Sequence, residues 1–353
     1  MAGVVFSKEE KIEMFQDFVD FGVKYIDLMP SVSVEEQSLV KDLINAGFAE
    51  NIVASTMSRK EHVDLALKLG IENIALFNSL SDIHLQSKLR ISREENIARS
   101  SGIIDYAASH GLKIFFAGED ASRADLNYVL EFVKEIENKI ECFFPCDTVG
   151  ILTPFDSFNL IAEIKKNIKT KIGLHCHNDF GLATANSLAG IEAGAEIFSG
   201  TFTGIGERAG NAPIEEMVLI LKFLKNYSDD FRIEKISSIC RKVQKFSGIK
   251  VQNHKPIIGK NVFRHESGVH VDGQLKNRLN YSPFLAEEIG LKEELVLGKH
   301  SGTSLLKKIS AEQEIQADLI KALADVKSLS AIKKRAITKA ELKEILIKNK
   351  GVE

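Results

Sequence analysis

One pattern constrains the fold of this chain more than any other. Over its first two-thirds, short apolar runs alternate with amphipathic segments of helical length. The apolar runs predict seven strands, within VKYIDLMP, NIVASTM, NIALF, LKIFFAGED, IECFFPCDT, KIGLHCH and AEIFSGTFTG. Strands and helices that alternate in this way form a parallel sheet with helices outside it.

Two architectures fit this alternation, a closed barrel and an open doubly wound sheet. The open sheet requires a glycine-rich phosphate loop after an early strand, and no such loop is found. We therefore predict a (β/α)8 TIM-type barrel. Seven strands are one too few, and the chain opens on a helix, so the strand that we expect to be missing is the first, ahead of Met1.

Local signals place the helix starts. Serine followed three residues later by glutamate predicts a capping box. Three such pairs precede amphipathic segments: Ser7 with Glu10, Ser58 with Glu61, and Ser92 with Glu95.

The alternation stops near Asn226. A loop-rich segment and several helices follow, and the last of these are rich in Lys, Glu and Ala. We expect an incomplete barrel that forms the catalytic domain at residues 1–225. A smaller, mostly helical C-terminal subdomain should follow at residues 226–353, with a loop that acts as a lid or reaches a partner.

Composition narrows the function classes. The net charge of -3 argues against a nucleic-acid-binding protein. No apolar run has the length of a membrane span, and the first residues lack a signal-peptide core. The four cysteines form no C-x-x-C pair, which is typical of reduced thiols in the cytoplasm.

A pair of histidines indicates a metal site. His175 and His177 end a predicted strand, where residues two apart point to the same face, and Cys176 points to the other. Neutral imidazoles side by side suit a divalent cation, although two hydrogen-bonded structural histidines would give the same pattern. Asn211, in a glycine-rich turn after the next strand, could add an amide oxygen. Such a site would still need a carboxylate.

Other polar residues end strands at the same predicted edge. Glu119 and Asp147 are candidates for chemistry there, although each could be a helix cap, which is the interpretation that we favour for Asp120. His84 follows the NIALF strand and could line the same site or lie on the surface.

A loop outside the barrel contains two more histidines. FRHESGVHVDG includes His265 and His270 together with Glu266 and Asp272. A single loop histidine is usually a surface residue, but two in one polar loop favour a general base.

Several motifs together resemble one enzyme family. GLHCHNDFGLATANSLAGIEAGA, TGIGERAGNAPIEE, CDTVGILTP, GEDASRAD and HESGVHVDG with LGKHSG are similar to motifs of the homocitrate, isopropylmalate and citramalate synthases, from about Gly3 to about Leu306. The resemblance implies a metal-dependent (β/α) barrel that condenses acetyl-CoA with a 2-oxo acid. GEDASRAD, DTVGILTP and HESGVHVDG look most like homocitrate synthase, which uses 2-oxoglutarate, and particularly like the type that serves assembly of the nitrogenase iron–molybdenum cofactor.

The resemblance also implies roles for individual residues. It implies metal ligation by His175, His177 and Asn211, and substrate binding by Thr148, Asp27 and His84. It implies proton transfer by Glu119 and His270, and a catalytic role for Tyr281, which matches a tyrosine brought in by the C-terminal region. The implied cofactor is a divalent cation, and two histidines with oxygen ligands accept Mg, Mn, Fe, Co or Zn. In the family, the C-terminal region reaches over the barrel of a partner subunit, so self-association is implied.

The chain departs from the family in its N-terminal quarter. The family's first strand carries an arginine and an acidic metal ligand in a motif resembling LRDGEQ. The segment that usually follows this motif begins here at Gly3. Strand two ends with Asp27, Leu28 and Met29 in place of Glu and Gly, and a family arginine falls at Met57.

Three interpretations follow from these departures. The one that we prefer is a subunit of a split homocitrate synthase whose companion chain supplies the first strand. A gene start placed too far downstream would also explain the missing motif, though not Asp27 or Met57. The third is a non-catalytic binding or regulatory subunit. Pyruvate and 2-oxoisovalerate remain alternatives to 2-oxoglutarate, since the altered strands are those that select the oxo acid.

Overall fold

The computed structural model describes residues 1–227 and 230–351. The chain divides into two compact units. Unit 1 contains Met1–Arg232 and Ile239–Lys250, and unit 2 contains Ile233–Ser238 and Val251–Glu353. The catalytic and lid roles expected of residues 1–225 and 226–353 stay predictions.

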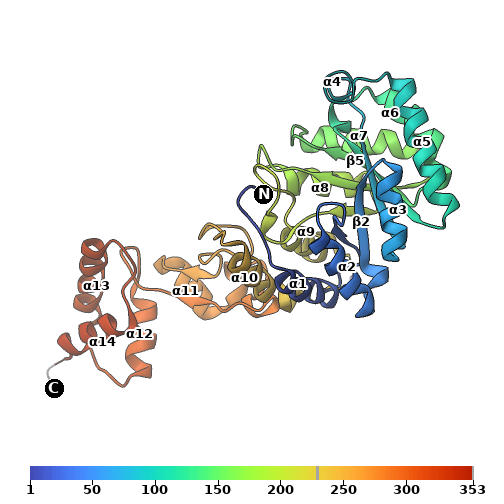
Figure 1. Cartoon of the computed structure of the whole chain (residues 1–353). Helices are drawn as coiled ribbons and strands as arrows, with labels where there is room; N and C mark the ends of the chain where they lie inside the picture. The colour runs from blue at the N-terminus through green and yellow to red at the C-terminus, as the bar shows by residue number, and fades with distance from the viewer. Residues whose placement is uncertain (228–229, 352–353) are drawn as a thin grey trace. The chain divides into compact units, whose positions relative to one another are not determined.

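Unit 1 is built on one curled parallel sheet of seven strands, in the order β1 to β7 (Figure 1). The strands are β1 (Ile26–Leu28), β2 (Ile52–Met57), β3 (Asn73–Ser79), β4 (Lys113–Glu119), β5 (Cys142–Asp147), β6 (Lys171–Cys176) and β7 (Ile197–Ser199). Among the described residues, β1 and β7 each pair with only one other strand. The sequence predicts a TIM-type barrel that lacks one strand, and the structure confirms this fold class. Each strand lies beside the strands that precede and follow it in sequence, as in such a barrel, and the seven strands form a curled half-barrel.

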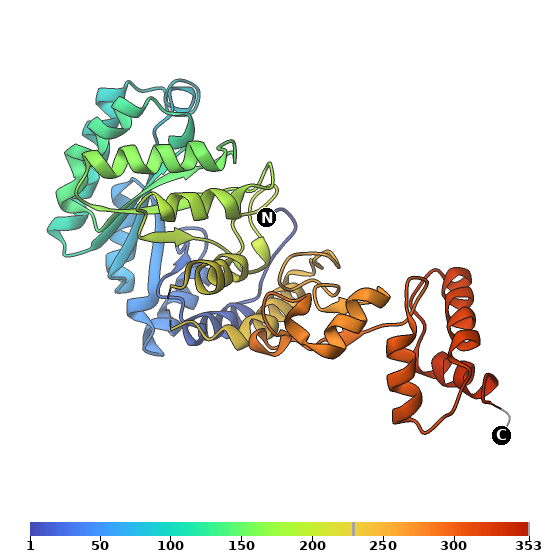
Figure 2. The same ribbon diagram turned by 180° about the vertical axis from the view of Figure 1, so that it is seen from behind.

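Helices cover the outer face of this sheet. They are α1 (Lys8–Phe21), α2 (Val34–Asn45), α3 (Lys60–Leu69), α5 (Arg93–Ser109), α6 (Leu126–Ile136), α7 (Pro154–Asn167), α8 (Ala183–Glu192) and α9 (Ile214–Leu219). The short helix α4 (Asp82–His84) follows the end of β3. α7 and α8 lie side by side, as the view from behind also shows (Figure 2). A π-helical turn, η2 (Leu85–Leu89), follows α4 directly. The helix α10 (Ile236–Ser247) begins in unit 2 and continues in unit 1 from Ile239.

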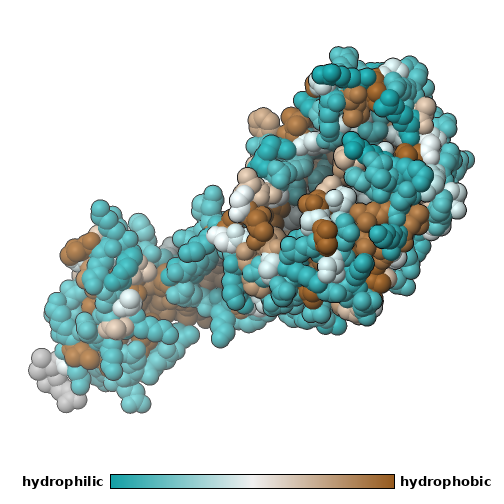
Figure 3. Space-filling view, viewed as in Figure 1, coloured by the Kyte–Doolittle hydropathy of each residue, from teal (hydrophilic) through white to brown (hydrophobic). Residues whose placement is uncertain are grey.

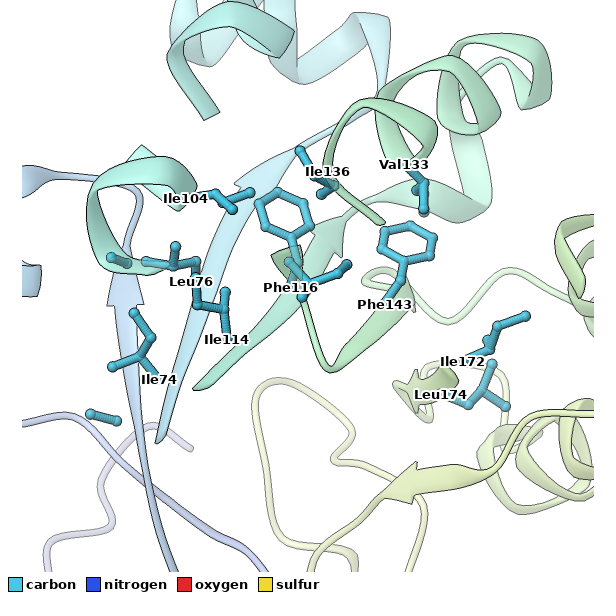
Figure 4. Close-up of a cluster of buried hydrophobic side chains, with 14 of the residues drawn as sticks. Ile74, Leu76, Ile104, Ile114, Phe116, Val133, Ile136, Phe143, Ile172 and Leu174 are labelled. Atoms are coloured by element: carbon cyan, nitrogen blue, oxygen red, sulfur yellow. The ribbon is translucent and has the colours of Figure 1, made fainter. Parts of the chain in front are cut away.

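Alternation along the strands divides the apolar side chains between two clusters. Residues such as Ile74, Phe116 and Phe143 point outward into the main core, where they pack with Val133 and Ile136 of α6 (Figure 4). Val53, Phe115 and Cys142 point inward and form a smaller cluster in the interior of the half-barrel. The parity that buries one set of side chains against the helices therefore fixes which residues face inward at the strand ends.

Two of the three predicted helix caps are confirmed. Ser7 and Glu10 form a complete capping box, and the Ser92 side chain accepts a hydrogen bond from the amide of Glu95. The prediction for Ser58 is wrong: its hydroxyl donates to the carbonyl of Phe77 on β3, and α3 begins after Arg59 without a side-chain cap. The competing acceptor on a neighbouring strand explains the difference.

Unit 2 has its own core. It contains α11 (Gly268–Lys276), α12 (Thr303–Glu312), α13 (Leu319–Lys333), α14 (Lys339–Lys348) and a two-stranded sheet of β8 (Arg264–His265) and β9 (Glu294–Leu295). Val271, Leu306, Val326 and Leu346 are buried in one cluster. Within the part of the chain that the structure describes, every helix is too short or too polar to cross a bilayer.

Candidate functional site

The inward side chains at the carboxyl ends of the strands form the candidate site of unit 1. Parity places Asp27, Ser79, Glu119, His175 and Ser199 on the inner face, since each alternates with residues of the outer core. Hydrophilic side chains cover most of the outer surface of unit 1 in Figure 3, and a hollow with apolar side chains opens between them.

The two histidines of the GLHCH motif converge. Their Nε2 atoms are 3.3 Å apart, and the Nδ1 atom of His175 lies 3.0 Å from the hydroxyl of Ser199 on β7. Cys176 lies on the outer face in the main core, as the alternation predicts. Gly173 makes room at the start of the motif, because a Cβ atom there would collide with the ring of Phe144.

Both imidazoles are held in the neutral form. Burial lowers the pKa of His175 to about 4, and the neighbouring His177 adds to the effect. Burial also lowers the pKa of His177, with a contribution from Arg208. Neutral imidazoles offer the lone pairs that a metal ion needs.

Asn211 lies beside His177, as expected from the sequence. The two residues form an isolated antiparallel bridge, and the amide of Asn178 donates to the carbonyl of Gly210. The side chain of Asn211 packs on Gly206, where a Cβ atom would lie 2.5 Å from its Nδ2 atom. Its Oδ1 atom is buried and has no hydrogen-bond partner among the described residues.

These three residues fit part of a divalent-cation site. A 3.3 Å separation is that of two nitrogens bound to one ion by bonds of about 2.1 Å. The unpaired Oδ1 atom of Asn211 could serve as a further ligand atom. Binding an ion would break no hydrogen bond of this oxygen, because it has none among the described residues. No group of three or more His, Cys, Asp or Glu residues within the described ranges could hold an ion. The chain thus presents two imidazoles and an amide without the expected carboxylate.

An arginine that the sequence did not single out ties the loops around this pair together. Arg208 makes two 2.8 Å hydrogen bonds to the carboxylate of Asp179 and a 2.5 Å bond to the carbonyl of Thr148. Thr148, a predicted substrate ligand, also accepts a 2.8 Å bond from the amide of Asp120 through its hydroxyl. The loops after β4, β5, β6 and β7 are therefore connected, which holds the site's rim in place.

A second polar cluster surrounds Glu119 at the end of β4. Its carboxylate accepts hydrogen bonds from the hydroxyl of Ser79 and from Lys88, whose Nζ atom lies 2.8 and 2.6 Å from the two oxygens. The Nδ1 atom of His84 is 3.1 Å from the Ser79 hydroxyl and 3.9 Å from the Glu119 carboxylate. The structure thus brings together His84 and Glu119, which the sequence presented as separate candidates.

The charge state of Glu119 follows from these partners. Burial by itself would raise the pKa of its carboxyl, but the hydrogen bonds from Lys88 and Ser79 outweigh burial and hold the pKa below its ordinary value. The residue is an anion with a cation in contact, whereas the imidazoles of β6 are neutral.

Two neighbouring carboxylates are structural. Asp120 is fully buried, and its carboxylate contacts the guanidinium of Arg123 and the hydroxyl of Ser81. Asp147 lies on the parity of the outer face and accepts hydrogen bonds from the amides of Ile151 and Leu152. Asp147 ends β5 at the same edge as Glu119, as expected, but the sheet pairs Gly118 with Pro145, so the side chain of Asp147 is out of phase with that of Glu119.

Asp27 lies on the inner face at the end of β1. Its carboxylate accepts 3.2 and 2.6 Å hydrogen bonds from the amide and hydroxyl of Ser55. The side chain of Asp27 is exposed to solvent, but many protein atoms lie around its carboxylate, as expected inside a concave face. Burial raises its pKa to about 6, against the effect of the two Ser55 bonds.

In unit 2, the predicted catalytic residues His270 and Tyr281 lie together. Their rings stack with centroids 4.1 Å apart and an interplanar angle of 16°. His265 is buried, and its Nε2 atom lies 3.0 Å from the Nε2 atom of Gln274. Glu119 belongs to unit 1 and His270 to unit 2. Their proposed pairing therefore stays a prediction.

The prediction that FRHESGVHVDG is a loop is wrong: His265 lies on β8, and His270 and Asp272 lie on α11. The acidic residues of this segment have structural partners. Glu266 accepts a 3.1 Å bond from the amide of His300, and its carboxylate lies where a Cβ atom on Gly298 would be. Asp272 contacts Lys276 and Ser304. These contacts join HESG to GKHSG, and they leave His270 of α11 as the candidate base of this segment.

Sequence reasoning missed Lys88, Ser79, Ser199 and Arg208 as site residues. A signal existed for Lys88, which is four residues after His84 and so shares its side of a helical turn. Ser79 and Ser199 end strands with the parity of Glu119 and His175, but their partners depend on the sheet register.

Comparison with known proteins agrees with these observations. The HMGL-like family model matches residues 1–243, and the homocitrate synthase post-HMGL domain-like model matches residues 257–336. Homocitrate synthase AksA of Methanothermobacter thermautotrophicus is 40% identical over 307 residues, which cover 86% of this chain and 78% of that protein.

Two other proteins extend the comparison. A probable 2-isopropylmalate synthase of Ignicoccus hospitalis is 42% identical over 306 residues, 85% of this chain and 76% of that protein. The crystal structure of the HMG-CoA lyase of Bacillus subtilis superposes with a TM-score of 0.61 at 19% identity, covering 70% of this chain and 89% of that one. This likeness shows the fold. With its half-barrel, its histidine pair and both family matches, the chain belongs to the HMGL-like family, in the group of homocitrate and isopropylmalate synthases.

Proposed function

We propose that this chain is a homocitrate synthase subunit, an acyltransferase that condenses acetyl-CoA with 2-oxoglutarate to homocitrate and CoA. The observation that carries the proposal is the convergence of two neutral imidazoles at the strand ends of a family barrel, with Asn211, whose amide oxygen is unpaired, bridged to His177 through the backbone. Relatives named homocitrate synthase AksA, at 36–40% identity, support the choice of reaction.

Each residue has a defined part in this reaction. His175, His177 and Asn211 would hold a divalent cation, which when bound would supply Lewis-acid chemistry at the oxo-acid carbonyl. His270 removes a proton from the acetyl methyl group, with Glu119 as its proton-transfer partner and Tyr281 stacked on its ring. The deprotonated methyl carbon then forms a bond to the keto carbon of the oxo acid, while the π electrons of the keto C=O bond pass to its oxygen, which takes up a proton to become the hydroxyl group of the product. Water cleaves the thioester, and CoA leaves as the thiol. Thr148, Asp27 and His84 orient the substrate.

The oxo acid is 2-oxoglutarate in this proposal, with 2-oxoisovalerate and pyruvate as the competing substrates. The relatives named 2-isopropylmalate synthase are the reason to test 2-oxoisovalerate as a competing substrate. The use of the product in assembly of the nitrogenase cofactor stays a prediction from the sequence motifs, as does a cytoplasmic location.

A partner chain completes the site in this proposal. Two observations support it: β1 and β7 each have one unpaired edge within the described sheet, and the metal ligands lack a carboxylate. A homologous companion subunit could supply a strand with an acid and an arginine. Self-association of this chain through unit 2 is the second arrangement that the family resemblance implies.

The test is co-expression with a homologous companion chain, followed by measurement of CoA release with each of the three oxo acids. We expect weak turnover by this chain alone and restored turnover with the companion, greatest with 2-oxoglutarate and with homocitrate identified by mass spectrometry. Full activity of the purified single chain would contradict the proposal that a companion chain completes the site. Preference for another oxo acid would contradict the substrate.

One observation favours a second function, that of a non-catalytic binding or regulatory subunit. The described residues contain no group of three or more His, Cys, Asp or Glu that could hold a metal ion. This function predicts weak metal binding and no acetyl-CoA turnover in any combination of chains. The same co-expression experiment distinguishes it, because the catalytic proposal requires turnover when the companion is present.

A further inference from the structure

Lys88 is the charged residue in contact with Glu119 that neither the motifs nor the family comparison assigns. It lies on the π-helical turn η2, which follows α4 and directs the lysine toward the end of β4. Such turns are rare, and they are frequent at functional sites. Lys88 bonds both oxygens of Glu119, at 2.8 and 2.6 Å, and approaches the hydroxyl of Ser79 at 3.4 Å.

The other groups around Glu119 cannot replace this cation. Ser79 is neutral and donates one hydrogen bond to the carboxylate. His84 is 3.9 Å away and also faces Asp120, at 3.6 Å, so its ring lies between two carboxylates. Cys146, on the adjacent strand β5, is a buried thiol whose pKa burial raises far above its ordinary value. Lys88 is therefore the group that fixes both the charge and the direction of the Glu119 carboxylate.

We propose that Lys88 is a positioning residue for Glu119: its ammonium group keeps the carboxylate ionised and directed into the concave face, ready for proton transfer. This inference rests on the proposed function for its catalytic meaning. Its structural part, the control of Glu119 by Lys88, stands on the contacts alone. Because Lys88 is about half exposed, at 49%, we expect it to matter through orientation and charge rather than through stability.

The experiment uses the full chain and compares Lys88→Met with Lys88→Arg. Lys60→Met is the matched control, since Lys60 is a lysine of similar exposure, 58%, whose carboxylate partner is Asp64. The titration of Glu119 is followed by carbon NMR of the glutamate carboxyls and assigned by its loss in Glu119→Gln. We expect the midpoint of Glu119 to rise by about one pH unit in Lys88→Met. It should stay near the wild-type value in Lys88→Arg and Lys60→Met. An unchanged midpoint in Lys88→Met, or an equal rise in Lys60→Met, overturns the proposal.

A kinetic measurement with the companion chain tests the catalytic meaning. We expect kcat of Lys88→Met to fall by about tenfold, the acidic limb of kcat/KM to move to higher pH, and KM for the oxo acid to stay unchanged. A raised KM for the oxo acid without movement of the acidic limb makes Lys88 a substrate ligand and overturns the proposal. Absence of turnover in the wild type refutes the proposed function by itself, while the NMR titration still decides whether Lys88 controls Glu119.

Discussion

The strand ends of β3 and β4 and those of β6 and β7 lie on the same face of one sheet but differ in charge. At β4, Glu119 is ionised and touches Lys88. At β6, burial keeps His175 and His177 neutral, with their nitrogens 3.3 Å apart. The first region is suited to moving a proton and the second to holding a cation, so one face offers two chemistries side by side.

The difference shows how partners decide what burial does. Burial disfavours the charged form of every group on this face. Glu119 overcomes it because a lysine supplies two hydrogen bonds, whereas Asp27 at the end of β1 has only Ser55 and its pKa rises to about 6. For His177, burial and the charge of Arg208 outweigh the attraction of the Asp179 carboxylate, and for His175 burial and His177 both lower the pKa.

Removing one imidazole should have the largest effect. We expect His177→Ala to lower condensation by the assembled enzyme by on the order of 10⁴-fold, because Lewis-acid polarisation contributes several kcal/mol. Equilibrium dialysis with Mn²⁺ or Zn²⁺ should show weaker binding as well. His110→Ala, at an exposed histidine, is the control. Equal metal affinity in both variants would remove the β6 region from the metal site.

Neutralising the charged region should come next. We expect Glu119→Gln to lower kcat by about 10³-fold, since positioned acid–base groups contribute about 10²–10⁴. Metal affinity should stay at the wild-type value, because the carboxylate belongs to the other cluster. Glu141→Gln, at an exposed glutamate before β5, should be unaffected. A loss of metal binding in Glu119→Gln would erase the distinction between the two regions.

Loss of the bond that orients His175 should have a smaller effect. The hydroxyl of Ser199 lies 3.0 Å from Nδ1 and fixes which nitrogen faces His177. We expect Ser199→Ala to weaken metal affinity by about 10–100-fold, the usual cost of removing such a support. Ser109→Ala, on the outer surface, serves for comparison. An affinity within twofold of wild type would show that packing alone orients the ring.

The smallest effect concerns stability and compares two carboxylates. The pKa of Asp27 is raised from 3.8 to about 6, so the folded state binds more protons than the unfolded state between these pH values. Ionisation of Asp27 therefore costs stability as pH rises. The free energy of unfolding of Asp27→Asn, relative to that of the wild type, should increase from about pH 4 to about pH 6.

Glu119→Gln should show the opposite slope. The lowered pKa of Glu119 gives the wild type stability that is present above pH 4.5 and is lost as pH falls below that value. The free energy of unfolding of Glu119→Gln, relative to that of the wild type, should therefore decrease as pH rises toward 4.5. Urea unfolding curves measured both below pH 4.5 and from about pH 4 to about pH 6 give the slope for each variant. Parallel slopes for the two variants would mean that Lys88 does not distinguish the two acids.

Local periodicity accounts for what could be predicted. The seven strands and the shared face of His175 and His177 follow from alternation within a few residues, and the Ser7 cap from a four-residue motif. Long-range contacts account for what could not. Ser58 is diverted from α3 by a carbonyl on β3, and Ser199 meets His175 only through the β6–β7 register. The spacing of Lys88 four residues after His84 is a local signal, but the pairing of Lys88 with Glu119 also depends on the π-helical turn η2, which was not predicted from the sequence.

The lengths of the strands carry one more consequence. The outermost strands β1 and β7 have three residues each, whereas β3 and β4 have seven. Protection of backbone amides against hydrogen exchange should therefore be greatest in the middle of the sheet and decrease toward both edges. Glu119 would keep its place during small openings in which the end of β7, and with it the support of His175, is already released.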